Sequence, residues 1–416
     1  MLSADQFCVL VLTEDGKVLS EDLPVEGLPE NEIYVSVHSA TMHSAALTDR
    51  GILYVWGRHV GVFVGDGAAY CDTTKHAPIC VPSHVFGGMR VTKVALGDMN
   101  TCVVANGCLF TGGWRIGGRL GYSVTDEMSA GDMLVGMKHV PIQDECSAAV
   151  SVVDVATGSN SSGIVGLDGS VWTWGLNGFG ECGLGDNAVC REPTRVTTVG
   201  AECDMAFNAA QIEMHSHTVV VASDGRVNVW GRNDTGQLGL DDLRMRPSPT
   251  HLECVPMRSA ACGYAHTLLL TTNGDIWGCG SNIFGECGTG ECEEVRTPTR
   301  VDGVSSVVYM SAGLGQSVAA TIDGEMFQWG VSRKNDFDAV YWPCVLEIPS
   351  DYTHTHTPEL FTLQTRVGLD HRMPQEMELA LAMCTHARLG DKSPLHVLCT
   401  DIIQRVAEAW VVRPRL

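Results

Sequence analysis

The sequence is poor in positive charge and lacks any long hydrophobic run. Lys and Arg number 27 against 49 Asp and Glu, which gives a formal net charge of −22. A surface this acidic repels phosphate groups, so we expect no direct nucleic-acid binding and favour protein partners that carry basic patches. No run of about 18 apolar residues occurs, so no membrane insertion is expected.

Signals for export and for zinc binding are also missing. Met1–Asp5 holds no basic residue, and the apolar run Phe7–Leu12 is too short for the hydrophobic part of a signal peptide. The 17 Cys contain no Cys-x-x-Cys pair, so a zinc finger is not expected. These features predict reduced thiols and an intracellular protein, cytoplasmic, cytoskeletal or nuclear, that is not secreted.

Motifs that carry enzyme chemistry are absent as well. The sequence holds no P-loop, no nucleophile elbow and no Gly-x-Gly-x-x-Gly after a predicted strand. Its acidic residues are scattered, so no catalytic pair of carboxylates can be argued. His354 and His356 have no identifiable third ligand and are interpreted as part of a solvated linker. We therefore expect no catalytic residues, no metal and no cofactor.

What the sequence does contain is an internal repeat rich in glycine, of which there are 46. In four copies a turn dipeptide ending in Gly lies five residues before a Trp-Gly pair, with the tryptophans at Trp56, Trp174, Trp230 and Trp329. In two further copies the Trp is replaced, by Cys279 and by Gly112. The copies recur 49 to 62 residues apart. In the middle three copies, further Gly, Asn and Pro residues recur at fixed distances from the Trp position.

The repeat predicts a small antiparallel sheet. Asn-Gly and Asp-Gly favour tight hairpin turns, because these turns require positive φ. The runs on either side of Asp224-Gly225 alternate with the period of a half-buried strand. A sheet of about 50 residues cannot bury both faces alone, and a radial arrangement of such sheets, a β-propeller, solves this problem.

The number of blades follows from the number of copies. Six fuller copies and an N-terminal fragment, in which Cys8–Leu12 precedes Asp15-Gly16, predict seven blades, and six blades is the alternative. The fragment is expected to pair with a strand near Phe361–Val367 and so to close the ring without a free edge.

Two strings in the middle copies identify the repeat. Gly263–Thr267 reads Gly-Tyr-Ala-His-Thr, and Trp230–Gly239 reads Trp-Gly-Arg-Asn-Asp-Thr-Gly-Gln-Leu-Gly. These strings resemble the repeats of the regulator of chromosome condensation (RCC) family, over about residues 6–347. The resemblance implies a seven-bladed propeller. Family members include an exchange factor for the nuclear GTPase Ran, a plant ultraviolet-B photoreceptor and domains that only bind proteins.

A role in photoreception is not expected from this resemblance. The photoreceptor of the family carries Gly-Trp-Arg-His-Thr strings, whereas this chain has Tyr264 and Ala265 in place of the Trp and the Arg.

After about Gly368 the pattern changes to the period of helices. Gly390 is a favourable C-cap for a first helix, and Ser393-Pro394 opens a second one. The apolar residues of the second helix form a candidate docking surface: Leu395, Leu398, Ile402, Val406 and Trp410. We expect a propeller over 1–368 and a helical hairpin over 369–416, which packs on the propeller's own face or docks on a partner. The predicted fold is therefore all-β, a seven-bladed β-propeller of RCC-type repeats with a short C-terminal α-helical hairpin.

The recurring residues are interpreted as structural. The four tryptophans are expected in the cores of the blades, and Gly175, Gly231 and Gly280 in equivalent places of successive blades. The histidines recur thirteen residues before the Trp position, at His43, His217 and His266. Such recurrence indicates a repeated hydrogen-bonding role rather than catalysis or metal binding.

Two functions from different classes follow from these observations. The first is a protein–protein interaction scaffold, an acidic propeller subunit of a larger assembly whose loops supply the contacts. The alternative is a guanine-nucleotide exchange factor for a Ran-like small GTPase, which rests on fold analogy. An exchange factor needs a wedge for the nucleotide site. The candidate insertion lies between the second and third copies and holds the candidate partner-contact residues Asp126, Glu127 and Asp132.

Overall fold

The computed structural model describes residues 4–5, 8–12, 17–20, 23–40, 43–57, 75–122, 134–197, 207–331, 339–345 and 362–365. The chain divides into two compact units, Met1–Val367 and Gly368–Leu416, and all described residues belong to the first. Besides strands, these residues form two short 3-10 helices, η2 (Ser83–Phe86) and η3 (Ile116–Gly118). Neither described helix has the length and hydrophobicity needed to cross a bilayer.

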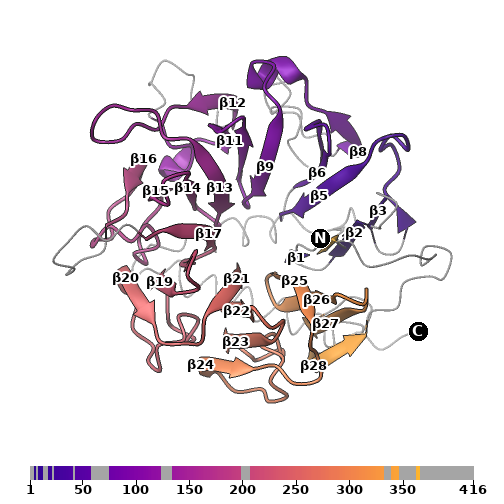
Figure 1. The fold of residues 1–416 in the computed structure, drawn as a ribbon, viewed down its shortest axis with the longest axis vertical. Coiled ribbons are helices and arrows are strands. Elements are labelled where there is room, and N and C mark those ends of the chain that lie inside the picture. The colour runs from indigo at the N-terminus through magenta and orange to yellow at the C-terminus, as the bar shows by residue number, and fades with distance from the viewer. Residues whose placement is uncertain are drawn as a thin grey trace, which may run out of the picture. The chain divides into compact units, whose positions relative to one another are not determined.

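Six four-stranded antiparallel sheets, here called blades one to six, follow one another along the chain and stand in a ring (Figure 1). In each blade the strands pair in chain order, with the first strand nearest the centre and the fourth at the periphery. Blade one consists of β5 (Tyr34–Ser39), β6 (His43–Thr48), β7 (Leu53–Gly57) and β8 (Lys75–Cys80). Blade two consists of β9 (Val91–Leu96), β10 (Asn100–Ala105), β11 (Cys108–Trp114) and β12 (Leu134–Val140). Blade three consists of β13 (Val152–Thr157), β14 (Ser161–Gly166), β15 (Val171–Gly175) and β16 (Cys190–Arg195). Blade four consists of β17 (Ala209–Met214), β18 (His217–Ala222), β19 (Val227–Gly231) and β20 (Arg246–Leu252). Blade five consists of β21 (Met257–Cys262), β22 (His266–Thr271), β23 (Ile276–Gly280) and β24 (Val295–Arg300). Blade six consists of β25 (Val307–Ala312), β26 (Gln316–Thr321), β27 (Met326–Val331) and β28 (Ala339–Val345).

The turn dipeptides of the repeat connect the second strand of each blade to the third. In blade two Ala105 lies opposite Cys108, so Asn106-Gly107 is a two-residue turn. Both turn residues have positive φ, 46° and 78°, which an Asn-Gly pair adopts at low cost.

The hydrophobic core lies between neighbouring blades. Every residue of the second strand is buried in all six blades, because this strand is covered on both faces. Trp230 of blade four, for example, packs in one cluster with Val165 and Val171 of blade three. Each blade therefore buries its faces against its neighbours, as a propeller requires.

A further five-stranded sheet stands beside the six blades. It contains β1 (Ala4–Asp5), β2 (Cys8–Leu12), β3 (Val18–Ser20), β4 (Leu23–Pro24) and β29 (Thr362–Thr365). The predicted pairing of the N-terminal fragment with a strand near 361–367 is confirmed, since Val9 lies opposite Thr365 and Leu12 opposite Thr362.

The predicted fold class, seven RCC-type blades with a C-terminal helical hairpin, is wrong. The structure has six four-stranded blades, and its described residues contain no α-helix. The prediction counted the N-terminal fragment as a seventh copy, but the sheet that it joins is built differently. Its strands hold two to five residues each, and one of them comes from the distant β29. The residues expected to form the hairpin, 369–416, lie outside the described residues.

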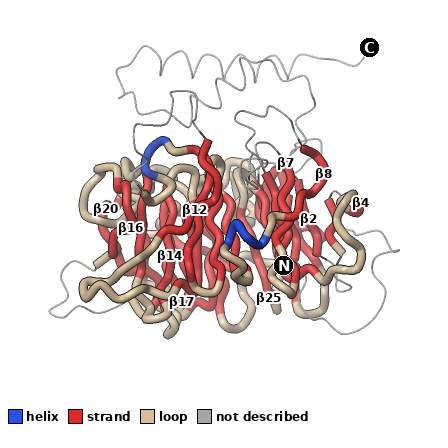
Figure 2. The backbone as a smooth tube through the Cα atoms, turned by 90° about the horizontal axis from the view of Figure 1, so that it is seen from above, coloured by secondary structure: helices blue, strands red, loops and turns tan. Residues whose placement is uncertain are grey.

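The strands run between two faces, at which the turns and loops gather (Figure 2). Because each blade is an antiparallel meander, its connections alternate between the faces. The connections from first to second and from third to fourth strands reach one face, called the loop face here. The connections from second to third strands and from blade to blade reach the other, called the turn face.

Candidate functional site

The recurring tryptophans join blades to the ones before them. In blades three, four and six the indole is fully buried, and its Nε1 donates a 2.9 Å hydrogen bond to a loop carbonyl of the preceding blade. The pairs are Trp174 with Arg119, Trp230 with Glu181 and Trp329 with Glu286. In blade five Cys279 takes the Trp position, and its Sγ lies 3.7 Å from the Gln237 carbonyl oxygen. Trp56 is equally buried, but its Nε1 has no partner among the described residues.

The recurring histidines form a second set of links, directed to the following blade. In each case Nε2 lies within hydrogen-bonding distance of a hydroxyl on the next blade's second strand. The pairs are His43 with Thr101 at 2.6 Å, His217 with Thr267 at 2.7 Å and His266 with Ser317 at 2.9 Å. Burial lowers the pKa of His266 to about 3, so this ring is neutral in the folded protein.

Gly175, Gly231 and Gly280 occupy equivalent places in blades three, four and five. Each ends the third strand opposite the first residue of the second strand, in the pairs Ser161–Gly175, His217–Gly231 and His266–Gly280. A Cβ on Gly280 would lie 2.5 Å from the Ala265 carbonyl oxygen, so a side chain is excluded there. The recurring Trp, His and Gly residues therefore stabilise the frame of the propeller. Sites of function are expected on the surfaces of this frame.

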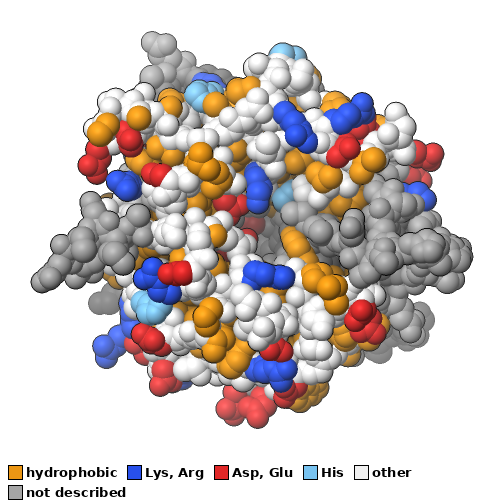
Figure 3. All heavy atoms as spheres, in the orientation of Figure 1, with side chains coloured by type: hydrophobic (Ala, Val, Ile, Leu, Met, Phe, Trp, Pro, Cys, Tyr) orange, Lys and Arg blue, Asp and Glu red, His pale blue; other side chains and the backbone are white. Residues whose placement is uncertain are grey.

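A cavity of about 710 Å³ lies at the centre of the ring, lined by the first strands of all six blades. Figure 3 shows one face of the molecule, hollowed at its centre, with basic side chains beside the hollow and acidic ones both within it and toward the periphery. In the cavity wall Lys93 Nζ lies 3.1 Å from Asp154 Oδ1. The other oxygen of Asp154 accepts a 3.1 Å hydrogen bond from the Ile212 backbone N–H. This ion pair joins blades two and three across the first strands.

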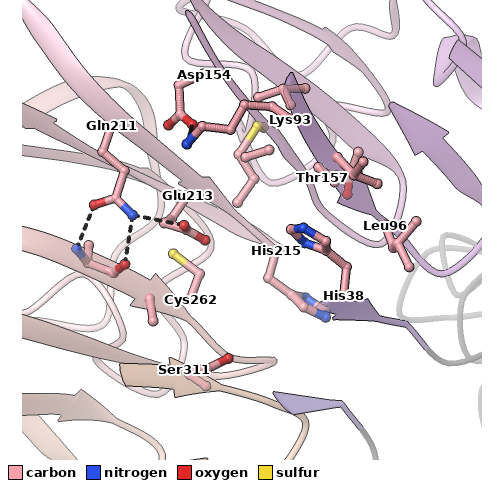
Figure 4. A pocket seen from close by; sticks show the side chains of 18 of the residues that line it. His38, Lys93, Leu96, Asp154, Thr157, Gln211, Glu213, His215, Cys262 and Ser311 are labelled. Atoms are coloured by element: carbon pink, nitrogen blue, oxygen red, sulfur yellow. Dashed lines mark hydrogen bonds and ion pairs between the residues drawn. The ribbon is translucent and has the colours of Figure 1, made fainter. Parts of the chain in front are cut away.

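Gln211 joins blades four and five in the same wall (Figure 4). Its side-chain amide accepts a hydrogen bond from the Ala260 N–H at 2.9 Å and donates to the Ala260 carbonyl at 3.2 Å. The same Nε2 donates to Glu213 Oε1 at 3.0 Å. Burial and then the negative charge of Asp154 raise the pKa of Glu213 to about 8. Glu213 therefore holds its proton at neutral pH.

Two titratable side chains of the cavity wall, Cys262 and His38, are held in their neutral forms by burial. Burial raises the pKa of Cys262 well above its ordinary value, so its thiol stays protonated. Burial lowers the pKa of His38 to about 3, which keeps that imidazole neutral. Within the described ranges no group of three or more His, Cys, Asp or Glu is placed to hold a metal ion.

On the loop face Arg232 of blade four lies against aromatic side chains of the two neighbouring blades. Its guanidinium carbon lies 5.3 Å from the ring centre of Phe179 in blade three and 5.4 Å from that of Tyr264 in blade five. Its Nη2 pairs with Asp234 Oδ2 at 2.7 Å. His215 meets the Tyr264 ring edge to face, with 5.3 Å between ring centres. Cation–π contacts of this kind hold the rings in place.

Sequence reasoning missed this cluster, although a signal was present. Phe179 and Phe284 both lie five residues after the Trp position of their copies. An aromatic residue recurring in a loop, where no core requires it, indicates a surface role. The predicted contact residues Asp126, Glu127 and Asp132 lie outside the described residues, as do His354 and His356. The predicted docking-helix residues also lie outside: Leu395, Leu398, Ile402, Val406 and Trp410.

Comparison with known proteins identifies the repeat. The sequence profile of the regulator of chromosome condensation (RCC1) repeat matches residues 168–221, 224–270 and 273–320, and a second RCC1-repeat profile matches 258–286. The chain contains RCC1 repeats. Each of the three long matches begins before the third strand of one blade and ends in the second strand of the next. An RCC repeat thus ties two blades together covalently.

Known relatives align with most of this chain. The ultraviolet-B receptor UVR8 of Arabidopsis thaliana is 25% identical over 328 residues, which cover 76% of this chain and 69% of the receptor. The human E3 ubiquitin-protein ligase HERC2 is 26% identical over 349 residues, which cover 82% of this chain but 7% of the ligase. The crystal structure of Prp20p from Saccharomyces cerevisiae superposes with a TM-score of 0.67 at 20% identity, covering 92% of this chain and 96% of Prp20p. This likeness shows an RCC1-like propeller fold.

Proposed function

We propose that this RCC-repeat protein is a protein-interaction scaffold that makes its contacts through the loop face. The observation that carries the proposal is the cluster of Phe179, Arg232 and Tyr264, which brings side chains from three blades, two of them aromatic, onto one partly exposed surface. Aromatic residues and arginine are enriched where proteins bind proteins. The hydrogen bonds between blades hold this surface in place, so binding orders few groups.

The relatives support protein partners. Prp20p has been described with its binding properties to Gsp1p and histones. The net charge of −22 favours partners with basic surfaces for this chain.

The test is native purification of the full chain from cells, followed by mass spectrometry. A Phe179→Ser/Tyr264→Ser variant is expected to lose the main partner, whereas Leu167→Ser on the turn face retains it. The absence of any stoichiometric partner from the wild-type preparation would refute the scaffold function.

A guanine-nucleotide exchange factor for a Ran-like small GTPase is the second candidate, favoured by the likeness to Prp20p. Ran loaded with fluorescent GDP is mixed with the purified full chain, and nucleotide release is followed. Acceleration by orders of magnitude would replace the scaffold proposal with exchange activity. Unchanged release would remove the exchange candidate.

We also propose an intracellular location. Among the residues whose side chains are described, twelve cysteines carry free thiols. Thiols in this number persist unpaired in reducing compartments. Fractionation of cells that express the chain tests this, and recovery from the medium would contradict it.

A further inference from the structure

Exposed apolar side chains gather on the loop face of blades four and five. Ile283 and Phe284 are 60% and 48% exposed, and Tyr264 is 40% exposed. Tyr264 and Phe284 border the same connection of blade six: the Tyr264 N–H donates to the Gly313 carbonyl at 3.1 Å, and Phe284 Cδ2 lies 3.5 Å from where a Cβ on Gly315 would be. Further exposed apolar side chains occur in the neighbouring loops: Val189, Leu243 and Met245. A grouping of this kind on one face marks an interaction site.

The aromatic part of this surface is held rigidly before any partner binds. Arg232 lies against the rings of Phe179 and Tyr264, and its charge is matched by Asp234 at 2.7 Å. The guanidinium of Arg232 therefore holds the rings, and its own charge is balanced by Asp234. Side chains that are already ordered lose little entropy when a partner arrives.

The loops around these side chains are strongly acidic. The connections between third and fourth strands in blades three, four and five, residues 176–189, 232–245 and 281–294, contain nine Asp or Glu against two Arg. Many of these carboxylates are exposed, among them Asp186, Asp241, Glu291 and Glu293. An apolar surface with an acidic rim is complementary to a chain that carries basic residues around an apolar side chain.

We propose that the loop face of blades three to five binds a basic protein segment that inserts an apolar anchor between Tyr264 and Phe284. This inference rests on the proposed scaffold function and names the chemistry of its partner. The acidic loops attract the basic residues over a long range, and the apolar side chains supply the short-range contact. Binding must therefore depend on salt and on the anchor together.

The turn face offers a matched control. Leu167 and Ile322 are 73% and 50% exposed there, close to the values for Ile283 and Phe284. Each is followed by an Asp of a turn dipeptide, Asp168 and Asp323. A non-specific preference for exposed apolar groups would act on both faces alike.

The experiment is a fluorescence anisotropy titration of the full chain with two labelled peptides of Lys and Gly. One peptide carries two Leu anchors, and the other has Ser in their place. We expect the Leu peptide to bind at least about tenfold more tightly than the Ser peptide, and more weakly as salt is raised. Ile283→Ser/Phe284→Ser is expected to abolish this difference, and Leu167→Ser/Ile322→Ser to preserve it. Glu291→Lys/Glu293→Lys should weaken the binding of both peptides. An unchanged melting temperature of this variant is the control for folding.

Three outcomes would overturn the inference. The first is equal affinity for the two peptides, and the second is equal loss in the loop-face and turn-face variants. The third is a carbodiimide cross-link from Lys392 to Glu291 or Glu293, because it would make the chain's own segment 368–416 the occupant. If a stoichiometric partner still co-purifies from cells in any of these cases, the scaffold function stands and only the assignment of its partner fails.

Discussion

Gly285 and Gly303 have the same backbone conformation in different surroundings. Both have φ of +83°, but a Cβ on Gly285 would lie 2.5 Å from Tyr341 Cα, whereas one on Gly303 would meet no described atom within 4 Å. Gly303→Ala should therefore cost only the backbone strain, about 1 kcal/mol of unfolding free energy. Gly285→Ala adds a steric clash and should cost at least about 3 kcal/mol by urea denaturation. Equal losses would contradict the described contact.

His266 makes stability depend on pH in a predictable direction. Its folded pKa, about 3, lies below the ordinary value of 6.5, because burial disfavours the charged ring. As pH falls, His266 is protonated in the unfolded chain before it is protonated in the folded protein. The stability that the neutral ring contributes is therefore complete above the ordinary pKa and is lost as pH falls toward 3. Gln316 holds the corresponding position in blade six and keeps a polar group there. His266→Gln should therefore reduce the stability lost between pH 7 and 5 by about 2 kcal/mol. An unchanged slope of stability against pH would refute this.

At the scale of the elements, the blades are held together by polar links as well as by their cores. Trp230 Nε1 and Thr218 Oγ1 both donate to the Glu181 carbonyl, at 2.9 and 2.8 Å. Both donors lie in blade four and the acceptor in blade three. Each sequence repeat also crosses a blade boundary, so covalent and hydrogen-bonded connections reinforce the same junctions.

The value of the indole hydrogen bond can be measured by comparing two blades. Trp230→Phe removes a bond to Glu181, whereas Trp56→Phe removes an Nε1 without a partner in the described structure. Both tryptophans are fully buried, so the loss of ring volume is similar. We expect Trp230→Phe to cost about 1 kcal/mol more than Trp56→Phe. Equal midpoints of denaturation for the two variants would show that the bond adds nothing to stability.

At the scale of the whole molecule, ring closure creates a cavity that no single blade contains. Its wall is built from the first strands of six blades, and it brings Glu213 near Asp154 of another blade. Burial, with the help of that second carboxylate, keeps Glu213 protonated to a pKa of about 8.

This arrangement predicts a loss of stability as pH rises from about 4.5 to about 8. Because the folded pKa of Glu213 lies above its ordinary value of 4.5, the folded state holds a proton that the unfolded chain releases. The contribution is complete below the ordinary pKa and is lost as pH rises toward about 8. As pH rises from 6 to 8.5, the free energy of unfolding of Glu213→Gln should increase relative to that of the wild type. The expected increase is about 1–2 kcal/mol after allowance for exposure to the cavity. A constant difference between the two proteins over that range would contradict the raised pKa.

The repeat made much of the frame predictable and little of the surface. The buried Trp174 and the glycine at Gly175 follow from a local pattern that recurs in each copy, so the sequence indicates them directly. The count of blades was wrong because the N-terminal fragment joins a sheet of short strands and does not form a seventh four-stranded blade. The loop-face cluster was missed because its members are distant, Phe179 being 53 residues before Arg232 and Tyr264 32 residues after it.

By itself, the sequence determined the repeat, the tight turns and the strands on either side of them. These features depend on the alternation of side chains and on which residues tolerate positive φ, and both are properties of short segments. Only the tertiary structure decided which side chains share the loop face and which carboxyl groups meet across the central cavity. Closing the ring sets those distances, since it brings together residues from different repeats that no local pattern connects.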